Sequence, residues 1–402
     1  MRILQIYDLS GGNDGPGHQM ARLRTGLEAR GHEVRLLTSR VQAAPGPRSD
    51  YEAFGTGHDK GQVVTQALNP SAARTLRRAL DEFRPDVVHV RQFLWQLSPL
   101  LMPPLRDVPT VFHVCHYKPI CPVATKLLPD GSPCRVRAGR ACLDHGCVTW
   151  RTWPFVMLQH GLFHRWRDVF DRWLALSDAM KERLEAEGLG PVTVVPNAIR
   201  ERPPRTARAP APLVCYAGRL ARAKGVQVLL RAMVPVAEAV PDVRVLIAGD
   251  GPFREALEAL SRELGLGEHV TFTGHLPREE MERRLEPAWV QVVPSLWEEP
   301  FGNVVTEAMM RGVAVIASAT GGILEIVRPG VDGLLVPPGD VEALSAALLE
   351  VVTGPERADE MGRAGRARAV ESFGEARLVD RIEGILEEVG GRRSTAGGNG
   401  PG

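Results

Sequence analysis

Short runs of apolar and β-branched residues alternate along the chain with longer segments in which apolar positions recur at helical spacing. This alternation predicts parallel sheets whose strands are joined by crossover helices. The expected strands of the first half are Ile3–Tyr7, Val34–Leu37, Val87–Val90, Thr110–Val114, Trp173–Leu176 and Val192–Val195. Those of the second half are Leu213–Ala217, Val243–Ala248, Val270–Thr273, Val290–Val293, Val313–Ala317 and Gly333–Val336. Equal numbers of strands in the two halves predict an α/β fold made of two doubly wound, Rossmann-like domains.

A proline-rich segment separates the two halves. Proline has no backbone donor for a sheet ladder, so we expect residues 201–212 to form an interdomain linker. The first domain then covers residues 1–200 and the second covers 213–372. We expect a C-terminal helix over 373–389 that packs back on the first domain. The glycine-rich end, 390–402, is expected to be disordered because it has almost nothing to bury.

Two segments of the first domain interrupt the regular alternation. Residues 40–65 are rich in Gly, Pro, Ser and Ala, which predicts a mobile loop. Residues 115–150 hold most of the cysteines of the chain and show little periodicity. We therefore expect a cysteine-rich insertion there.

The overall composition narrows the class of protein. In 402 residues, 49 Lys and Arg balance 48 Asp and Glu, and the net charge of +1 creates no field that favours nucleic acid. No apolar run approaches the roughly 18 residues of a membrane span, and the N-terminus lacks the pattern of a signal peptide. We expect a soluble, cytoplasmic protein that does not bind nucleic acid.

Two basic residues follow the first strand of the second half. That strand ends at Gly218, and Arg219 and Lys224 come just before a predicted helix. Glycine lets a ligand approach the backbone closely, and two cations at the carboxyl end of a strand suit a diphosphate. The alternative is a pair of solvated surface cations.

A glycine turn and a pair of acidic residues come next. Gly249 opens the turn after the second strand, and Glu299 and Glu307 flank a loop that is typical of a helix start. Free amides at a helix start favour an anion or sugar oxygens. Carboxylates accept hydrogen bonds from vicinal hydroxyls, as in ribose recognition. The alternative for Glu299 is stabilisation of the helix dipole.

The order and spacing of these elements resemble the retaining GT-B glycosyltransferases of family 4, the group 1 glycosyl transferases. The Gly-Arg-x4-Lys-Gly loop, the Gly-Asp-Gly-Pro turn and the Glu-x7-Glu element carry the resemblance. It implies a GT-B fold with two Rossmann-like domains facing a central cleft. It also implies that Arg219 and Lys224 hold the donor diphosphate, that Glu299 holds the hydroxyls of the donor sugar, and that Glu307 holds the nucleotide ribose.

Further substrate contacts are implied only by the resemblance. They are the helix start at Phe301, Gly302, Asn303 and Val304, and the residues that would flank the nucleotide and base, Gly249, His275 and Leu276. In the first half, Gly11 and Gly12 would face the donor; the alternative is a flexible connection.

A histidine of the first half is the expected catalytic partner. The position of the functional histidine in many relatives aligns without gaps with Cys115, while histidines occur nearby at His113 and His116. We expect His116, in the turn after the strand, to be catalytic, and His113 to be a second substrate-binding candidate or a core residue. A neutral imidazole there could hydrogen-bond the donor sugar or the acceptor.

The cysteines suggest a structural metal. Cys121, Cys134, Cys142 and Cys147 follow a spacing without the close pairs of a zinc knuckle. The possibilities are a structural zinc clip, one or two disulfides, or unlinked thiols. The resemblance implies that catalysis itself needs no metal or other cofactor.

The resulting hypothesis is transfer of a sugar from a UDP- or GDP-sugar to an acceptor hydroxyl, with retention of the anomeric configuration. The acceptor could be a saccharide, a lipid-linked molecule or a small natural product. The aromatic-rich segment 150–166 could be core, an acceptor lip or a shallow membrane contact. The alternatives for function are a non-hydrolysing sugar-nucleotide epimerase and a non-catalytic nucleotide-sugar-binding protein.

Overall fold

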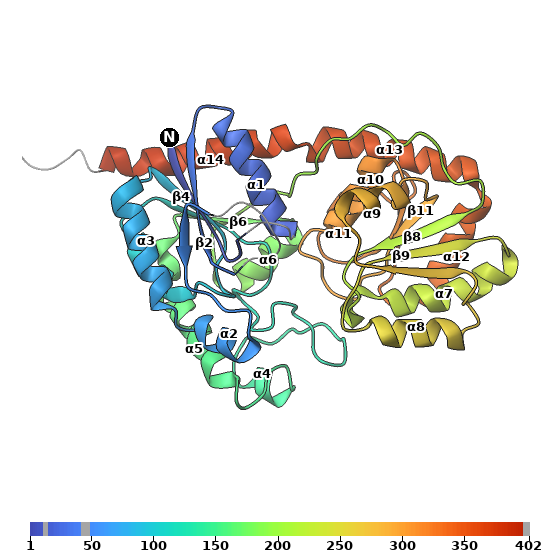
Figure 1. Cartoon of the computed structure of the whole chain (residues 1–402), viewed down its shortest axis with the longest axis horizontal. Coiled ribbons are helices and arrows are strands. Elements are labelled where there is room, and N and C mark those ends of the chain that lie inside the picture. The colour runs from blue at the N-terminus through green and yellow to red at the C-terminus, as the bar shows by residue number, and fades with distance from the viewer. Residues whose placement is uncertain (11–14, 42–48, 397–402) are drawn as a thin grey trace, which may run out of the picture. The chain divides into compact units, whose positions relative to one another are not determined.

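The computed structural model describes residues 1–10, 15–41 and 49–396 and divides the chain into two compact units (Figure 1). Unit 1 contains residues 1–198 together with the C-terminal segment that starts at Glu375, and unit 2 is Ile199–Gly374. The chain therefore crosses between the units twice. Gly11, Gly12 and residues 42–48 lie outside the described residues, so the sequence-based role of the glycine pair stays a prediction.

Unit 1 is a seven-stranded sheet with helices on its faces. Its strands are β1 (Arg2–Tyr7), β2 (Glu33–Ser39), β3 (Tyr51–Ala53), β4 (Val87–Gln92), β5 (Thr110–His113), β6 (Arg172–Ala175) and β7 (Val192–Val194). Its helices are α1 (Gly15–Glu28), α2 (Asp59–Thr65), α3 (Pro70–Phe83), α4 (Ala141–Asp144), α5 (Trp153–Trp166), α6 (Asp178–Ala186) and α14 (Glu375–Ala396). Short 3-10 turns are η1 (Pro99–Leu101), η2 (Pro103–Leu105) and η3 (Arg167–Val169). All pairings between the strands are parallel.

Unit 2 repeats this architecture around a six-stranded parallel sheet. Its strands are β8 (Leu213–Ala217), β9 (Arg244–Ala248), β10 (Val270–Gly274), β11 (Val290–Val293), β12 (Ala314–Ser318) and β13 (Leu334–Val336). Its helices are η4 (Arg222–Lys224), α7 (Val226–Ala239), α8 (Arg254–Glu263), α9 (Arg278–Leu285), α10 (Asn303–Arg311), α11 (Ile323–Ile326), α12 (Val341–Thr353) and α13 (Pro355–Phe373).

The strand order shows where each sheet changes direction. The order is β3-β2-β1-β4-β5-β6-β7 in unit 1 and β10-β9-β8-β11-β12-β13 in unit 2. In both sheets the first strand of the unit is central, so the chain winds outward in one direction and then in the other. Ligands of such sheets bind beyond the carboxyl ends of the strands at this switch point. In unit 2 the switch point lies between β8 and β11.

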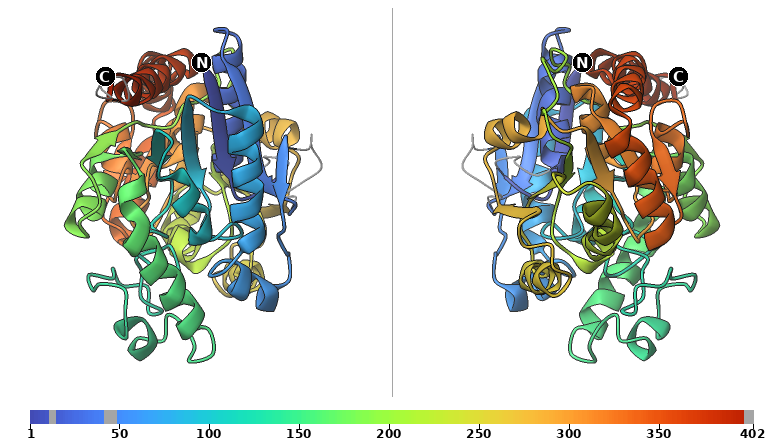
Figure 2. Two further views of the ribbon diagram at one scale, coloured as in Figure 1. Left: turned by 90° about the vertical axis from the view of Figure 1, so that its left-hand side faces the viewer. Right: turned by 90° about the vertical axis from the view of Figure 1, so that its right-hand side faces the viewer.

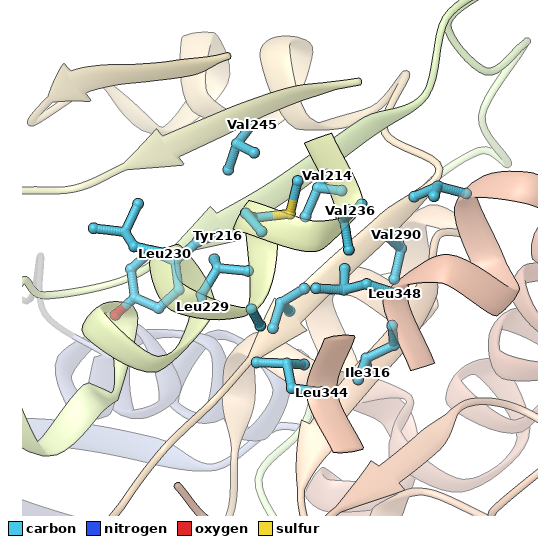
Figure 3. Close-up of a cluster of buried hydrophobic side chains, with 14 of the residues drawn as sticks. Val214, Tyr216, Leu229, Leu230, Val236, Val245, Val290, Ile316, Leu344 and Leu348 are labelled. Atoms are coloured by element: carbon cyan, nitrogen blue, oxygen red, sulfur yellow. The ribbon is translucent and has the colours of Figure 1, made fainter. Parts of the chain in front are cut away.

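The core of unit 2 forms where two helices cover one face of its sheet. Leu229 and Val236 of α7 and Leu344 and Leu348 of α12 point toward the strands in Figure 3, and all four are buried. The strand residues that they cover are Val214, Val245, Val290 and Ile316. Burying one such side chain contributes about 1.5–3 kcal/mol relative to leaving it exposed. The apolar runs that predict the strands are thus also the residues that hold the sheet to its helices.

Every predicted strand is present, with ends that differ by two residues at most. The prediction of a mobile loop over residues 40–65 is wrong in part, because β3 and α2 lie within it. Tyr51 and Ala53 of β3 are buried, and they pair with Leu37 and Ser39 of β2. Pairing with the edge of the sheet thus decides the structure of a segment whose local composition favours a loop.

The C-terminal helix differs from its predicted limits. The helix α14 runs over Glu375–Ala396, so the disorder expected from residue 390 is wrong as far as residue 396. Leu378, Ile382 and Leu386 of this helix pack in the core of unit 1 with Ile3 and Val87. A Cβ at Gly390 would lie 2.9 Å from Met1 Cε. Figure 2 shows the end of the helix close to the N-terminus. Close packing at Gly390 extends the helix where glycine alone predicts its end.

The expected linker over residues 201–212 is fixed to unit 2. The carboxylate of Asp359 in α13 accepts one hydrogen bond from the guanidinium of Arg205 and one from that of Arg208, each at 2.5 Å. Trp289 donates through its indole N–H to the carbonyl of Ala209 at 2.8 Å. The segment connects β7 of unit 1 with β8 of unit 2, and its arginines hold it against unit 2. The chain crosses between the units at residues 198/199 and 374/375.

Replacing Asp359 with alanine should free this segment. The substitution leaves Arg205 and Arg208 without their shared carboxylate, so trypsin should cut the folded variant after these two arginines, where the parent protein resists. Limited proteolysis followed by mass spectrometry measures the sites and rates of cleavage. Glu356→Ala, an exposed carboxylate on the same helix, is the control. Equal cleavage of all three proteins in segment 201–212 would show that Asp359 does not hold it.

A buried histidine predicts a pH dependence of stability. His89 in β4 is fully buried, and neither ring nitrogen has a hydrogen-bond partner among the described residues. Burial, followed by the charge of Arg91, lowers its pKa to about 3. Because the unfolded chain binds the proton more readily, stability that is present above pH 6.5 is lost as the pH falls toward 3.

Urea unfolding should detect this loss. Between pH 6.5 and 5.5 the free energy of unfolding should fall by about 1 kcal/mol because of His89 alone. The variant His89→Gln, which cannot titrate, should show a smaller fall over the same interval. An identical pH dependence in the two proteins would contradict this assignment.

Candidate active site

Three glycine turns meet at the carboxyl edge of the sheet in unit 2. The N–H of Gly218, after β8, donates to Ala248 O at 3.0 Å, and the N–H of Gly249, after β9, donates to Gly274 O at 3.1 Å. Gly249 has a φ of 149°, and a Cβ there would lie 1.9 Å from Gly218 O. Only glycine therefore permits this approach, which brings the predicted nucleotide-flanking residues together. His275, which is exposed, and Leu276 follow directly after Gly274.

A close backbone approach also places Lys224. The 3-10 turn η4 ends at Gly225 with a φ of 74°, and a Cβ on Gly225 would lie 1.7 Å from Pro294 O. The N–H of Leu296 donates to Ala223 O at 2.8 Å. The turn that carries Lys224 thus lies directly against the loop after β11, the neighbouring strand at the switch point.

Lys224 and Glu299 form an ion pair across these two loops. The distance from Lys224 Nζ to Glu299 Oε1 is 2.7 Å, and Ser295 Oγ donates to the same oxygen at 2.7 Å. Glu299 is 6% exposed. Its second oxygen, Oε2, has no hydrogen bond within the described part of the chain. The ammonium also lies 4.9 Å from the ring centroid of Trp297. A buried carboxylate with one oxygen fixed and one available suits the binding of hydroxyl groups.

Arg219 lies in the same region as this pair. Tyr216 donates its hydroxyl to Arg219 O at 3.1 Å, and the pKa of that hydroxyl is raised first by burial and then by the nearby Glu299. The Arg219 side chain is exposed and has no ion pair among the described residues. The structure thus gathers Arg219, Lys224 and Glu299, predicted from separate segments, at one edge of the sheet. Arg219 remains as a positive charge that no described carboxylate neutralises.

The loop that carries Glu299 is held from behind by a second glycine turn. The N–H of Gly322 donates to Glu299 O at 2.9 Å, and a Cβ on Gly321 would lie 2.3 Å from the same oxygen. Phe301 is buried against Phe373, with the ring centroids 5.6 Å apart. These contacts give residues 321–322 a structural role, and they fix the direction in which the loop enters α10.

The helix α10 begins at Asn303 after Gly302, whose φ is 115° and which provides no side-chain cap. The first turn of the helix, which contains Val304, is the positive end of the helix dipole. One face of α10 carries Glu307, and Arg278 Nη2 of α9 lies 3.3 Å from its Oε1. Sequence reasoning missed Arg278, because its partner is distant in the sequence and no spacing rule joins them.

In unit 1, His116 keeps one ring nitrogen available. Its Nδ1 accepts the N–H of Lys118 at 3.0 Å, which assigns the proton to Nε2. This Nε2 is shielded from solvent and has no hydrogen-bond partner among the described residues. Burial, then the charge of Lys118, lowers the pKa of His116 to about 3. His116 is thus a neutral hydrogen-bond donor at neutral pH, which is the form that the sequence-based role requires.

His113 has no free nitrogen for a substrate, so its assignment as a substrate-binding residue is wrong. It is fully buried in β5, where its Nε2 donates to Val195 O at 3.0 Å and its Nδ1 accepts from Arg91 at 3.0 Å. Burial and the neighbouring Arg91 hold its pKa well below the ordinary value. The alternation of side chains along the strand directs His113 into the sheet interior, and the turn after the strand frees His116.

Sequence reasoning also missed Asp8 and Lys118. Asp8, at the end of β1, accepts three backbone N–H groups from residues 95–97 at 2.8, 2.8 and 3.0 Å. Burial raises its pKa to about 6, although those hydrogen bonds act in the opposite direction. Lys118 donates to Pro122 O at 2.6 Å, and burial lowers its pKa to about 8. Together these two charged groups fix the loops beside His116.

The four candidate cysteines of segment 115–150 are neighbours, because the pKa of the Cys147 thiol is raised by burial and then by the other three. A tetrahedral zinc site with Zn–S bonds of about 2.3 Å needs all four sulfurs within about 4 Å of one another. Among the described residues, no three of the potential ligands in segment 115–150 lie within 4.8 Å of one another, and all the cysteines are free thiols. Cys121, Cys134, Cys142 and Cys147 are therefore unlinked thiols in this structure, and the structural zinc clip stays a prediction. Two of the sulfurs also contact the backbone: Cys121 accepts the N–H of Lys126, and Cys134 donates to Val136 O.

The one group with metal-ligand spacing in the described ranges is His32, Glu383 and Glu387 of unit 1. Glu383 already forms an ion pair with Arg30 and a hydrogen bond with His32. The Arg30 guanidinium thus already pairs with a carboxylate that a metal ion would need.

The aromatic-rich segment 150–166 divides between core and surface. Phe163 packs in a buried aromatic group with Phe93, Phe112 and Trp173. Trp150 and Phe155, in contrast, are exposed. No helix of the described chain combines the length and the apolar character needed to cross a membrane.

Two family models match consecutive parts of the chain. Residues 14–198 match the glycosyl transferase 4-like domain, and residues 198–368 match the glycosyl transferases group 1. A relative in Mycolicibacterium smegmatis, a GDP-mannose-dependent alpha-(1-6)-phosphatidylinositol monomannoside mannosyltransferase, is 36% identical over 186 residues. That match covers 44% of this chain and 49% of the relative, so the chain spans about half the length of this curated relative.

Solved structures share the fold along nearly the whole chain. Sucrose-phosphate synthase from Thermosynechococcus elongatus has a TM-score of 0.72 at 23% identity, covering 97% of this chain and 99% of that one. Anabaena HepE in complex with UDP-glucose has a TM-score of 0.67 at 19% identity, covering 96% and 100%. The two parallel-sheet units thus have the GT-B fold. The two adjoining family matches, which together cover residues 14–368, show that the chain belongs to the glycosyltransferases of group 1, family 4.

Proposed function

We propose that the protein transfers a sugar from a nucleoside diphosphate sugar to an acceptor hydroxyl, with retention of the anomeric configuration. The observation that carries this proposal is the pair formed by Lys224 and Glu299, at 2.7 Å, beside the unneutralised Arg219. At the switch point of one sheet, this arrangement places two cations that can bind a diphosphate next to a carboxylate that can bind sugar hydroxyls. Neither a dehydrogenase nor a hydrolase requires this combination.

The proposed reaction uses the two cations as its main electrostatic device. Charge develops on the diphosphate when the bond between the anomeric carbon and the phosphate oxygen breaks, and Arg219 and Lys224 neutralise it. A bond forms from the acceptor oxygen to the same face of the anomeric carbon, and the departing phosphate oxygen takes the acceptor proton. Glu299 orients the sugar through its hydroxyls, and Glu307 binds the ribose. We assign the acceptor to unit 1, where His116 presents a neutral N–H.

The donor is a UDP- or GDP-sugar. Support comes from the relatives: the M. smegmatis enzyme is named as GDP-mannose-dependent, and the Anabaena protein was solved with UDP-glucose. An epimerase would convert the donor without consuming an acceptor, and a binding protein would leave it unchanged. Product analysis with the donor alone, and with donor and acceptor together, separates the three functions.

Removal of the Lys224 ammonium tests the role of the cations. Lys224→Ala should lower the turnover number by about 100-fold, because a group that stabilises the departing charge is lost. Arg222→Ala is the matched control, since Arg222 lies in the same turn, is exposed and has no ion pair among the described residues. Steady-state kinetics with the best donor measures both variants. Near-normal turnover of Lys224→Ala, or an equal loss in the control, would refute this mechanism.

We further propose that the acceptor is met at a lipid surface, and the support for this is a set of exposed apolar side chains on unit 1. Trp150, just before α5, is 71% exposed, and Phe155 and Leu158 within α5 are 37% and 41% exposed. α2, which packs on α5 in Figure 1, adds Val64 and the nearby Leu68, both also exposed. We call these five residues the α5 surface. Most large apolar side chains of the protein are buried, so their concentration here suggests contact with an apolar phase.

Two arginines lie near the two ends of α5. Arg151 and Arg165 are exposed, and neither has a carboxylate partner among the described residues. Apolar side chains bordered by arginines are typical of a surface that lies on an anionic membrane. A lipid-linked acceptor would be presented there beside the acceptor-binding unit.

Vesicle binding tests this surface. The protein should sediment with phosphatidylglycerol vesicles, less so with phosphatidylcholine, and salt should weaken the binding. Replacing Trp150, Phe155 and Leu158 together with serine should reduce binding by about tenfold or more. Leu324→Ser, which removes an exposed leucine of unit 2, is the control. Absence of binding to anionic vesicles, or unchanged binding by the triple variant, would contradict the assignment.

A further inference from the structure

We infer that Arg278 is a positioning residue of the nucleotide site, which holds the Glu307 carboxylate in the orientation that binds the two ribose hydroxyls. This inference rests on the proposed function, because it assigns a new residue to the donor site. Arg278 is the first residue of α9. It follows directly after the turn that contains His275 and Leu276, the predicted neighbours of the base.

The contact between Arg278 and Glu307 joins two helices of unit 2. Arg278 Nη2 of α9 lies 3.3 Å from Glu307 Oε1 of α10, and both side chains are partly shielded from solvent. The other oxygen of Glu307, Oε2, has no hydrogen bond within the described residues. One oxygen is thus fixed by a guanidinium, and the other is available for a ligand. A long acidic side chain loses rotamer freedom when it binds, and a partner that fixes it beforehand reduces that cost.

A buried ionic network explains why Arg278 turns toward Glu307. Glu282, also on α9, accepts from Arg311 at 2.8 Å and lies 2.9 Å from Arg202. Its other oxygen is 4.0 Å from Arg278. Three guanidinium groups therefore share Glu282 and Glu307, and two of them already contact the same Glu282 oxygen. The repulsion among these cations favours Arg278 at Glu307.

The neighbouring arginines of the same helix lack this role. Arg283 and Arg284 both pair with Glu280 on the exposed side of α9, at 2.7 and 2.5 Å. Their removal changes the charge of α9 by the same amount as removal of Arg278 but leaves Glu307 untouched. Arg284→Ala is therefore a matched control for any general effect of charge.

Calorimetry with two pairs of nucleotides tests the inference. The probes are UDP and GDP and their 2′,3′-dideoxy analogues, with the parent protein first used to choose the base that binds more tightly. Arg278→Ala should weaken binding of the ribonucleotide by about tenfold, which is typical of losing a hydrogen bond to a charged group. It should leave the affinity for the dideoxy analogue unchanged, because that ligand has no hydroxyl for Glu307. Arg278→Lys should restore part of the affinity, and Arg284→Ala should behave like the parent.

A double-mutant cycle completes the test. Glu307→Ala should weaken binding of the ribonucleotide. Adding Arg278→Ala to this variant should cause no further loss of affinity, since Arg278 acts through Glu307. Additive losses, an equal loss for the dideoxy analogue, or no loss at all would overturn the inference. If Arg278→Ala does not fold, Arg278→Gln replaces it in the same measurements. Failure of the parent protein to bind either ribonucleotide would instead overturn the proposed function.

Discussion

The ion pair between Lys224 and Glu299 depends on a backbone contact that only glycine permits. Gly225 lies so close to Pro294 O that a Cβ there would lie 1.7 Å from it, and this contact joins the loops after β8 and β11. These loops follow the two strands on either side of the switch point, so their approach creates the candidate site. The ammonium then reaches a carboxylate that is almost completely buried. A buried carboxylate is costly unless it is paired, and here the cation that pairs with it is also the one that suits a diphosphate.

The sequence predicts those parts of the protein whose signals are local. Each strand is a short β-branched run, and Arg219, Lys224, Glu299 and Glu307 stand at fixed offsets from glycines or from one another. It does not predict contacts between distant segments. Arg278 meets Glu307 only because α9 and α10 pack together, and Asp8 finds its partners in a loop that follows β4. The same reason explains the errors: pairing with β2 orders β3, and packing against Met1 extends α14.

Buried charge and neutral histidine play different roles in the two units. In unit 2 the carboxylates of Glu299 and Glu307 each pair with a cation through one oxygen, and the other oxygen is available to a ligand. In unit 1, burial keeps His89, His113 and His116 uncharged at neutral pH. His116, in the turn after β5, combines this state with an Nε2 that is unpartnered among the described residues, whereas His89 lies within β4 and both ring nitrogens of His113 are occupied. A neutral donor can contact a sugar or an acceptor hydroxyl without competing with the cations for the diphosphate. This division agrees with a donor held by unit 2 and an acceptor met by unit 1.

A crystal structure of the protein with bound UDP or GDP tests the central claim most directly. The account predicts that the diphosphate lies within hydrogen-bonding distance, about 3 Å, of Lys224 Nζ and the Arg219 guanidinium, with the ribose hydroxyls on Glu307. A nucleotide bound at another surface, or a diphosphate held without either cation, would contradict it.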